Sequence, residues 1–278
     1  MTSAYDFRGK AVFVAGGTSG INLGIADAFA AAGASLAIVS RSTERVERAS
    51  GELRRHGGKV LGQSADVRDY AAIAATLAAA FDAFGAIDVL VSGAAGNFPA
   101  PALGMSANAF KAVVDIDLLG TFNVLRAAHQ HLRRPGASII NISAPQSYNP
   151  MPLQVHACAA KAGVDQVTRV LAMEWGADGI RVNSIAPGPI EGTEGFQRLS
   201  TPEARQKMVK RLPLQRFGTL NDVAELALFL ASPRASYITG ALIPVDGGWS
   251  LWGGGGSSTA MAMEVGTSSS AAPTVRGA

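Results

Sequence analysis

The stretch AVFVAGGTSGINLGIADAF, residues 11–29, passes from a valine-rich apolar run through a glycine-rich turn into a helical pattern. An apolar run without polar alternation is typical of a strand that is buried on both faces of a parallel sheet. Gly16 and Gly20 permit a sharp turn, after which the free N–H groups at the start of the helix can bind a pyrophosphate. The segment therefore predicts a nucleotide-binding unit of strand, turn and helix.

The same alternation of apolar runs and helical patterns continues to residue 252. Strands are expected at residues 11–16, 35–40, 59–67, 87–93, 138–143, 180–188 and 241–248. Since helical patterns separate them, right-handed crossovers join the strands. We therefore expect one doubly wound α/β domain of the Rossmann type over residues 1–252, with a mostly parallel seven-stranded sheet and helices on both faces.

Two segments differ from this pattern. Residues 201–219, TPEARQKMVKRLPLQRFGT, predict a short helical excursion over the carboxyl edge of the sheet, where it would act as a substrate lid. Residues 253–278 are rich in Gly, Ser and Ala and lack periodicity, which is typical of a flexible, non-catalytic tail.

Composition narrows the class of protein. The 278 residues are 48% hydrophobic and 16% charged, so the chain can bury a sizeable core. The net charge of +3 comes without a Lys/Arg-rich run, which argues against a nucleic-acid partner. Cys158 is the single cysteine, so neither an internal disulfide nor a thiolate metal site is expected, and the thiol itself is expected to pack as a small side chain. The absence of a long apolar run predicts no membrane partner and a cytoplasmic location.

The first three strand ends indicate which nucleotide binds. Asn22 stands two residues after Gly20, where a third glycine is common, so the turn should be slightly remodelled. The second strand ends in Arg41 and Ser42 with no carboxylate, which favours the 2′-phosphate of NADPH over the ribose hydroxyls of NADH. Asp66 follows the third strand, where a carboxylate can accept a hydrogen bond from the adenine amino group.

Together with Gly16, Gly20 and Asp66, the motifs Ala94-Ala95-Gly96, PGP (187–189) and VDGG (245–248), and Lys161, resemble the short-chain dehydrogenase/reductase family over residues 7 to 250. The resemblance implies a Rossmann fold, a nicotinamide cofactor and usually a homotetramer. The cofactor-binding residues that follow are Gly16, Thr18, Ser19, Gly20, Ile21, Arg41, Ser42, Asp66, Val67, Ala94, Ala95, Gly96, Lys161, Pro187, Gly188 and Ile190.

The expected catalytic set of that family is incomplete here. Most members use a tyrosine to protonate the carbonyl oxygen, a serine to hold it, a lysine on the ribose and an asparagine. This chain keeps Lys161 but has Ala157, Ala144 and Asp117 at the tyrosine, serine and asparagine positions. Ordinary ketone or alcohol chemistry is therefore poorly supported, whereas reduction of a conjugated C=C needs no acid at the tyrosine position.

Four segments, AAGNF (94–98), DIDLLGTFNV (115–124), LQVHACAAK (153–161) and APGPIEGTEG (186–195), resemble the 2,4-dienoyl-CoA reductase branch of that family, and within it the peroxisomal type. The resemblance implies an acyl-CoA thioester substrate, with hydride delivered from NADPH to Cδ of a 2,4-dienoyl-CoA. A water held by Asp117 and Lys161 then protonates Cα of the dienolate and yields a 3-enoyl-CoA. We expect Asp117 to be shielded and close to the lysine ammonium.

Two other functions stay open. A ketone or alcohol reductase of the same family could recruit Tyr148 or His156 as its acid, and a non-catalytic NADPH-binding scaffold would need neither. Asn97 and Phe98 are expected to line an acyl pocket. Arg198, before the lid segment, could meet the phosphates of coenzyme A or lie on a solvated helix face, and the same two interpretations hold for Lys207, Lys210 and Arg211.

Overall fold

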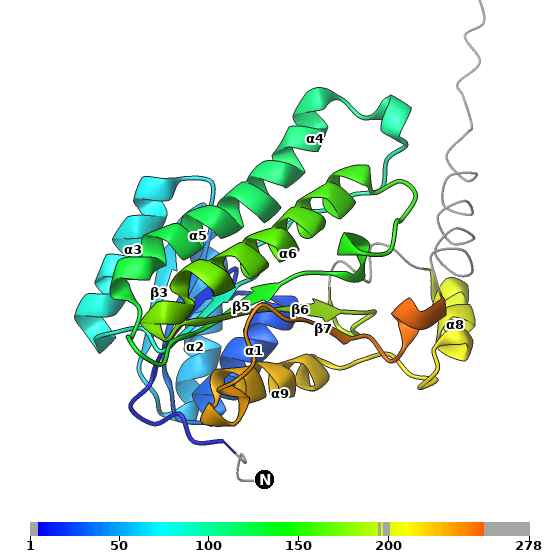
Figure 1. Ribbon diagram of the computed structural model, residues 1–278. Coiled ribbons are helices and arrows are strands. Elements are labelled where there is room, and N and C mark those ends of the chain that lie inside the picture. Colours follow the sequence, from blue (N-terminus) through cyan, green and yellow to red (C-terminus); the bar gives the residue numbers. More distant parts are fainter. Residues whose placement is uncertain (1–4, 194–195, 197–200, 253–278) are drawn as a thin grey trace, which may run out of the picture.

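The computed structural model describes residues 5–193, 196 and 201–252, and in this part of the chain it forms one layered α/β unit (Figure 1). Seven strands of a single sheet follow one another in the order β3-β2-β1-β4-β5-β6-β7, and every neighbouring pair is parallel. The strands are β1 Ala11–Ala15, β2 Ser35–Ser40, β3 Val60–Ser64, β4 Val89–Ser92, β5 Ser138–Ile142, β6 Arg181–Pro187 and β7 Leu242–Val245. The predicted doubly wound sheet is confirmed.

Helices cover both faces of the sheet (Figure 1). One face carries α1 Gly20–Ala31, α2 Thr43–Leu53 and α9 Leu220–Ala231. The other carries α3 Tyr70–Phe84, α4 Ala107–Val114, α5 Gly120–Ala128 and α6 Val155–Trp175, while α8 Pro202–Arg211 lies beyond the carboxyl ends of β6 and β7. Short 3₁₀ turns, among them η5 Pro145–Ser147, complete the connections.

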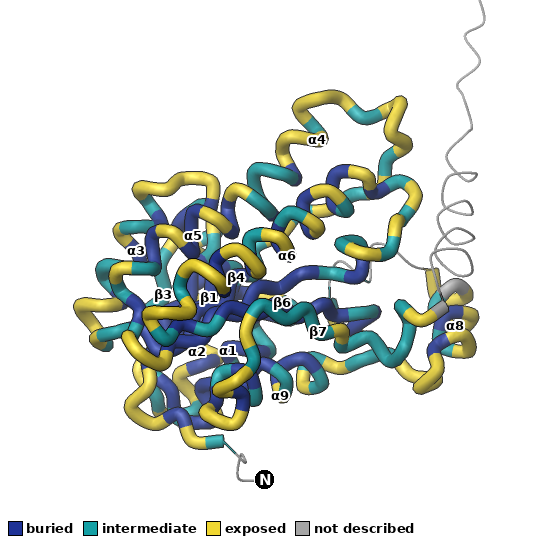
Figure 2. The backbone as a smooth tube through the Cα atoms, viewed as in Figure 1, coloured by how far each residue is buried: buried dark blue, intermediate teal, exposed yellow. Residues whose placement is uncertain are grey.

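The apolar strand runs explain why the sheet has two cores. In β1, Val12 and Val14 pack into the cluster beneath α1 and α9, whereas Phe13 packs into the cluster beneath α3 and α5. Successive side chains of a strand point to opposite faces, so a strand with helices on both sides must be apolar throughout. Figure 2 shows the result as a continuous band of buried backbone along the central strands.

A wide helical turn joins α4 to α5. The backbone stays helical from residue 107 to residue 128, but Asp115–Leu119 form a π-helix, and Asp117 is buried inside it. Such bulges occur frequently at functional sites because the extra residue redirects a side chain. Here the bulge turns the Asp117 carboxylate toward α6 and the loop after β4.

Several strand ends differ from the sequence-based expectation. The third strand stops at Ser64 rather than residue 67, because the chain turns at Asp66, whose carbonyl accepts a hydrogen bond from the Asp69 N–H. The last strand stops at Val245, since Gly247 and Gly248 both have positive φ, which ends the extended conformation. The predicted helix of the lid segment is confirmed as α8, and the predicted tail lies outside the described residues.

Candidate active site

A cavity of about 930 Å³ opens at the carboxyl ends of β1, β4, β5 and β6. A second cavity of about 210 Å³ lies beside it, and the two share Asn22, Arg41 and Arg45 among their lining residues. The strand order reverses between β1 and β4, and ligands of open α/β sheets bind in the crevice at such a switch point. The pair of cavities therefore lies where a dinucleotide and a substrate would meet.

Two glycines allow the loops around the cavity to approach one another closely. Gly16 has φ +79°, and a Cβ added there would lie 2.9 Å from the backbone of Ala94. A Cβ on Gly188 would lie 2.6 Å from the Asp246 Cα. No larger side chain fits at either position without moving backbone, so these loops approach closely around the cavity as a dinucleotide site requires.

Fifteen of the sixteen predicted cofactor residues line these cavities. The larger one is lined by Ser19, Gly20, Ile21, Arg41, Ala95, Gly96, Lys161, Pro187, Gly188 and Ile190. The smaller one adds Gly16, Thr18, Asp66, Val67 and Ala94. Ser42 is the exception, because its hydroxyl caps α2 by accepting a hydrogen bond from the Arg45 N–H at 3.3 Å.

Asn22, at the position of the third glycine, directs its amide toward the end of β4. Its Nδ2 donates to the carbonyl of Gly93 at 2.7 Å and to that of Gly16 at 3.4 Å. A Cβ on Gly93 would lie 2.2 Å from the Asn22 side chain, so this contact requires glycine at the end of β4. The asparagine thus ties the glycine-rich turn to the neighbouring strand end.

At the nucleotide end, the structure adds two arginines that were not predicted from the sequence, Arg68 and Arg45. Asp66 is held by Arg68, whose Nη2 lies 2.6 Å from a carboxylate oxygen, and this hydrogen bond lowers the pKa of Asp66. Arg45 lines both cavities beside Arg41, although sequence reasoning missed it. The available signal was its position four residues after Arg41, on the first turn of α2.

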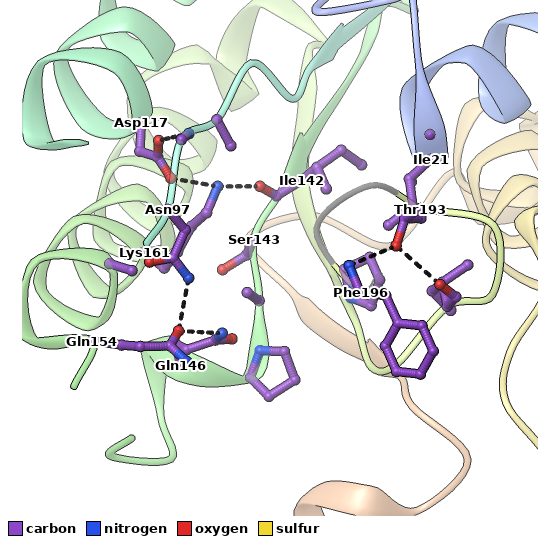
Figure 3. A pocket seen from close by; sticks show the side chains of 18 of the residues that line it. Ile21, Asn97, Asp117, Ile142, Ser143, Gln146, Gln154, Lys161, Thr193 and Phe196 are labelled. Atoms are coloured by element: carbon purple, nitrogen blue, oxygen red, sulfur yellow. Dashed lines mark hydrogen bonds and ion pairs between the residues drawn. The ribbon is translucent and has the colours of Figure 1, made fainter. Parts of the chain in front are cut away.

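Asp117 and Lys161 form a buried ion pair in the wall of the larger cavity (Figure 3). Lys161 Nζ lies 3.3 Å from Asp117 Oδ2 and donates to the Ile142 carbonyl at 3.0 Å. Asp117 Oδ1 accepts a hydrogen bond from the Gly96 N–H at 2.7 Å. Only 1% of Asp117 and 7% of Lys161 is exposed. The expected shielding and proximity of the carboxylate and the ammonium are confirmed.

The ion pair and its two backbone partners come from four different elements. Asp117 comes from the π-helix, Lys161 from α6, Gly96 from the loop after β4 and Ile142 from the end of β5. Burying two charges is costly unless further hydrogen bonds satisfy them, and the backbone groups of Gly96 and Ile142 supply these bonds. Ala157 lines the cavity one helical turn before Lys161, so a methyl group stands on the face that carries the ammonium.

The structure does not bring the two alternative acids into the cavity. Tyr148 follows η5 with 38% of its surface exposed, it does not line the cavity, and burial of the rest raises its pKa. His156 is fully buried and packs against Phe98, with ring centroids 4.5 Å apart, while burial lowers its pKa. Neither side chain lines the cavity, so their contact with substrate stays a prediction that the cavity lining does not support.

At the substrate end of the cavity, hydrogen bonds link the side-chain amides of Asn97, Gln154 and Gln146. Asn97 lines the cavity with Phe98, as predicted, and its Nδ2 donates to Gln154 Oε1 at 2.7 Å (Figure 3). Gln146 donates to the same oxygen at 3.1 Å. Sequence reasoning missed both glutamines, because nothing in their spacing shows that residues 97, 146 and 154 meet.

The lid segment contributes one apolar side chain. Met208 of α8 lines the cavity, whereas Lys207, Lys210 and Arg211 are not among the lining residues. Arg198 lies outside the described residues. Cys158 is partly buried, with its Sγ 3.9 Å from the Met151 carbonyl, as a packed side chain would be. In the described part of the chain, no group of three or more His, Cys, Asp or Glu side chains could hold a metal, and no helix is both long and apolar enough to cross a membrane.

The sequence matches, over residues 15–250, the model of a family described as Enoyl-(Acyl carrier protein) reductase. This match spans most of the chain, with six of the seven strands complete and the last residue of β1. The chain belongs to the short-chain dehydrogenase/reductase family. As a short-chain dehydrogenase/reductase, it is an oxidoreductase that uses a nicotinamide cofactor.

Individual proteins similar to this reductase include named 2,4-dienoyl-CoA reductases and a solved short-chain dehydrogenase structure. A Rattus norvegicus protein named peroxisomal 2,4-dienoyl-CoA reductase, (3E)-enoyl-CoA-producing, is 50% identical over 243 residues, which cover 86% of this chain and 83% of the relative. A probable (2E)-enoyl-CoA-producing 2,4-dienoyl-CoA reductase of Bacillus subtilis is 41% identical and covers 86% and 96%. The crystal structure of a putative short-chain alcohol dehydrogenase from Sinorhizobium meliloti matches with a TM-score of 0.84 at 34% identity, covering 90% and 100%.

Proposed function

We propose that this reductase catalyses the NADPH-dependent reduction of 2,4-dienoyl-CoA thioesters to 3-enoyl-CoA. The observation that carries the proposal is the buried Asp117–Lys161 pair, on a cavity wall where the usual tyrosine is Ala157. Such a site lacks a phenol to protonate a ketone oxygen but has a charged pair that can hold a water. The names of the rat and Bacillus relatives agree with this substrate class.

Different residues of the cavity serve the two steps of the reaction, hydride transfer and protonation. The bound nicotinamide cofactor supplies the hydride, which adds at Cδ and leaves the electron pair delocalised as a dienolate. Pro187, Gly188 and Ile190 would hold the nicotinamide and Lys161 its ribose. Asp117 and Lys161 hold a water that gives a proton to Cα. The Lys161 ammonium returns a proton to the hydroxide that is left, and solvent reprotonates the lysine before the next turnover.

A panel of thioesters tests this function directly. With NADPH and a 2,4-dienoyl-CoA, we expect steady loss of NADPH absorbance and a product whose remaining double bond is at C3. A 3-oxoacyl-CoA should give no turnover, because no acid faces its oxygen from the tyrosine position. Turnover of the 3-oxoacyl-CoA in preference to the dienoyl-CoA would contradict the proposal. A product with its double bond at C2 would support the proposed substrate but would show that the proton is added at a carbon other than Cα.

The cofactor preference depends on Arg41. Because Arg41 lines both cavities at the end of β2, we propose that it binds the 2′-phosphate, with Arg45 beside it. Arg41→Asp should weaken NADPH binding by about 10–100-fold, the equivalent of ~1.4–2.7 kcal/mol, and improve binding of NADH. Arg48→Asp, an exposed change on α2 outside both cavities, serves as the control. Equal affinity for NADPH in the Arg41 variant and the wild type would remove Arg41 from the phosphate site.

Tyr148 provides a test of the ketone-reductase alternative. Because its ring lies outside the cavity, Tyr148→Phe should change kcat for the dienoyl-CoA by less than about twofold, as is usual for a surface substitution. Steady-state kinetics with the dienoyl-CoA and with a secondary alcohol plus NADP measures both activities. Alcohol turnover that the substitution abolishes would favour the alternative.

Assembly, domain extent and location are part of the same proposal. We infer a homotetramer from the family, and a single catalytic domain over residues 1–252 followed by a non-catalytic tail. The cytoplasmic location stays a prediction, since the rat relative is named peroxisomal. Sedimentation of the purified full chain measures the oligomeric state.

A further inference from the structure

We propose that the Ser143 hydroxyl is a catalytic hydrogen-bond donor to the thioester oxygen of the substrate. This inference rests on the proposed function, because a dienolate oxygen exists only if the substrate is a conjugated thioester. It assigns to one residue the task of binding the negative charge, which the Asp117–Lys161 pair does not perform.

Ser143 lines the cavity, and its hydroxyl has no hydrogen-bond partner in the described structure. It follows the last residue of β5 and lines the cavity, with 3% of its surface exposed. Among the described residues, no hydrogen-bond partner lies within reach of its buried hydroxyl. Figure 3 shows this side chain projecting from the strand end toward the side of the cavity that holds Lys161 and Asn97. A buried, unsatisfied hydroxyl is unfavourable in the free protein, so a ligand oxygen is the partner that would compensate it.

The other hydroxyls of the described cavity wall serve elsewhere. Thr193 donates to the Ile190 carbonyl at 3.0 Å and accepts from the Phe196 N–H at 3.3 Å. Ser19 belongs to the glycine-rich turn that precedes α1 and lines the smaller cavity as well. Ser143 is therefore the hydroxyl at the substrate end that can still donate.

The neighbouring charged and amide groups already make hydrogen bonds within the protein. Two of the three N–H groups of Lys161 are used, on Asp117 and on the Ile142 carbonyl, which leaves one for the ribose or the water. Asn97 donates to Gln154, and both oxygens of Asp117 are acceptors. The adjacent Ile142–Lys161 bond fixes the end of β5, so the Ser143 hydroxyl is held beside the charged pair without being part of it.

The chemistry requires such a donor. When hydride adds at Cδ, the electron pair of the Cγ–Cδ π bond moves through the conjugated system to the thioester oxygen, and the nicotinamide is oxidised. The negative charge stays on that oxygen until Cα takes its proton from the water. A donor placed where charge develops stabilises the transition state more than the ground state. Ser143 keeps its own proton throughout, because it donates a hydrogen bond and is not consumed.

Size-matched substitutions test this role. Ser143→Thr keeps the hydroxyl and Ser143→Val replaces it with a methyl group of similar size. We expect the threonine variant to keep kcat within about fivefold, and both Ser143→Val and Ser143→Ala to lose roughly 10²–10³-fold in kcat, as when one oxyanion donor is removed. The Kd for NADPH should stay within about twofold, since Ser143 is not among the residues assigned to the cofactor.

Ser147→Ala is the matched control. Its hydroxyl is also buried without a partner in the described structure, four residues along the chain, but it does not line the cavity. It should leave kcat unchanged. Wild-type turnover together with full activity of Ser143→Ala would overturn this assignment and leave the proposed function intact. Failure of the wild type to reduce any 2,4-dienoyl-CoA would overturn both.

Discussion

Asp117→Asn is expected to lower kcat for dienoyl-CoA reduction by about 10²–10⁴-fold, the usual contribution of a positioned acid–base group. The asparagine keeps the shape of the side chain, and its carbonyl oxygen can still accept the hydrogen bond from the Gly96 N–H. It carries no charge, however, so it cannot form the ion pair with Lys161 or take part in proton transfer through a water. NADPH affinity should change by only a few-fold, because Asp117 lines the larger cavity but not the smaller one and is not among the residues assigned to the cofactor.

Single-turnover loss of NADPH absorbance, with cofactor affinity measured separately by fluorescence, distinguishes the two effects. Asp115→Asn is the matched control, since Asp115 lies two residues earlier in the same π-helix but pairs with Lys111 and lines neither cavity. It should leave the rate unchanged. A nearly wild-type rate in the Asp117 variant would show that the proton reaches Cα by another route.

The sheet was predictable because burial on both faces leaves a clear signal. Phe13 and Val14 need apolar surroundings on opposite sides, so β1 is apolar at every position and is recognisable without its neighbours. Strand ends give no such signal. Whether the chain continues past Ser64 depends on the turn at Asp66 and Arg68, whose hydrogen bonds form only when that loop folds.

The ion pair was predictable from the resemblance, but its supports were not. Asp117 and Lys161 are 44 positions apart, and only the fold shows that a π-helix turns the carboxylate toward α6. The bonds from Gly96 and to Ile142 depend on loop and strand backbone that carries no side-chain signal. Backbone partners of this kind cannot be recognised in one sequence.

The absence of His156 and Tyr148 from the cavity wall has a simpler cause. His156 precedes Ala157 on α6, and adjacent helix positions differ by about 100° around the axis, so the two cannot share a face. The cavity takes Ala157 and Lys161, which turns the imidazole into the space behind Phe98. Tyr148 follows a 3₁₀ turn, whose direction no periodicity predicts.

Lys161→Met should abolish measurable turnover and destabilise the fold, because it leaves the Asp117 carboxylate buried without its cation. Removing one partner of a buried pair typically costs about 3–5 kcal/mol of the free energy of unfolding. The Ile142 carbonyl also loses its donor. Lys111→Met is the control, since Lys111 belongs to an exposed pair with Asp115, and pairs of that kind contribute only about 0–1 kcal/mol.

A double-mutant cycle separates the pair from its surroundings. Asp117→Asn combined with Lys161→Met removes both charges, so the double variant should be more stable than the sum of the two single losses predicts, by about 0.5–3 kcal/mol. Urea unfolding of the four proteins measures this coupling, and kinetics of the same proteins should show no recovery of turnover. Strictly additive losses of stability would mean that the two side chains, although 3.3 Å apart, do not depend on each other. Recovery of stability without recovery of activity would show that the charges are retained in this cavity for the reaction and not for the fold.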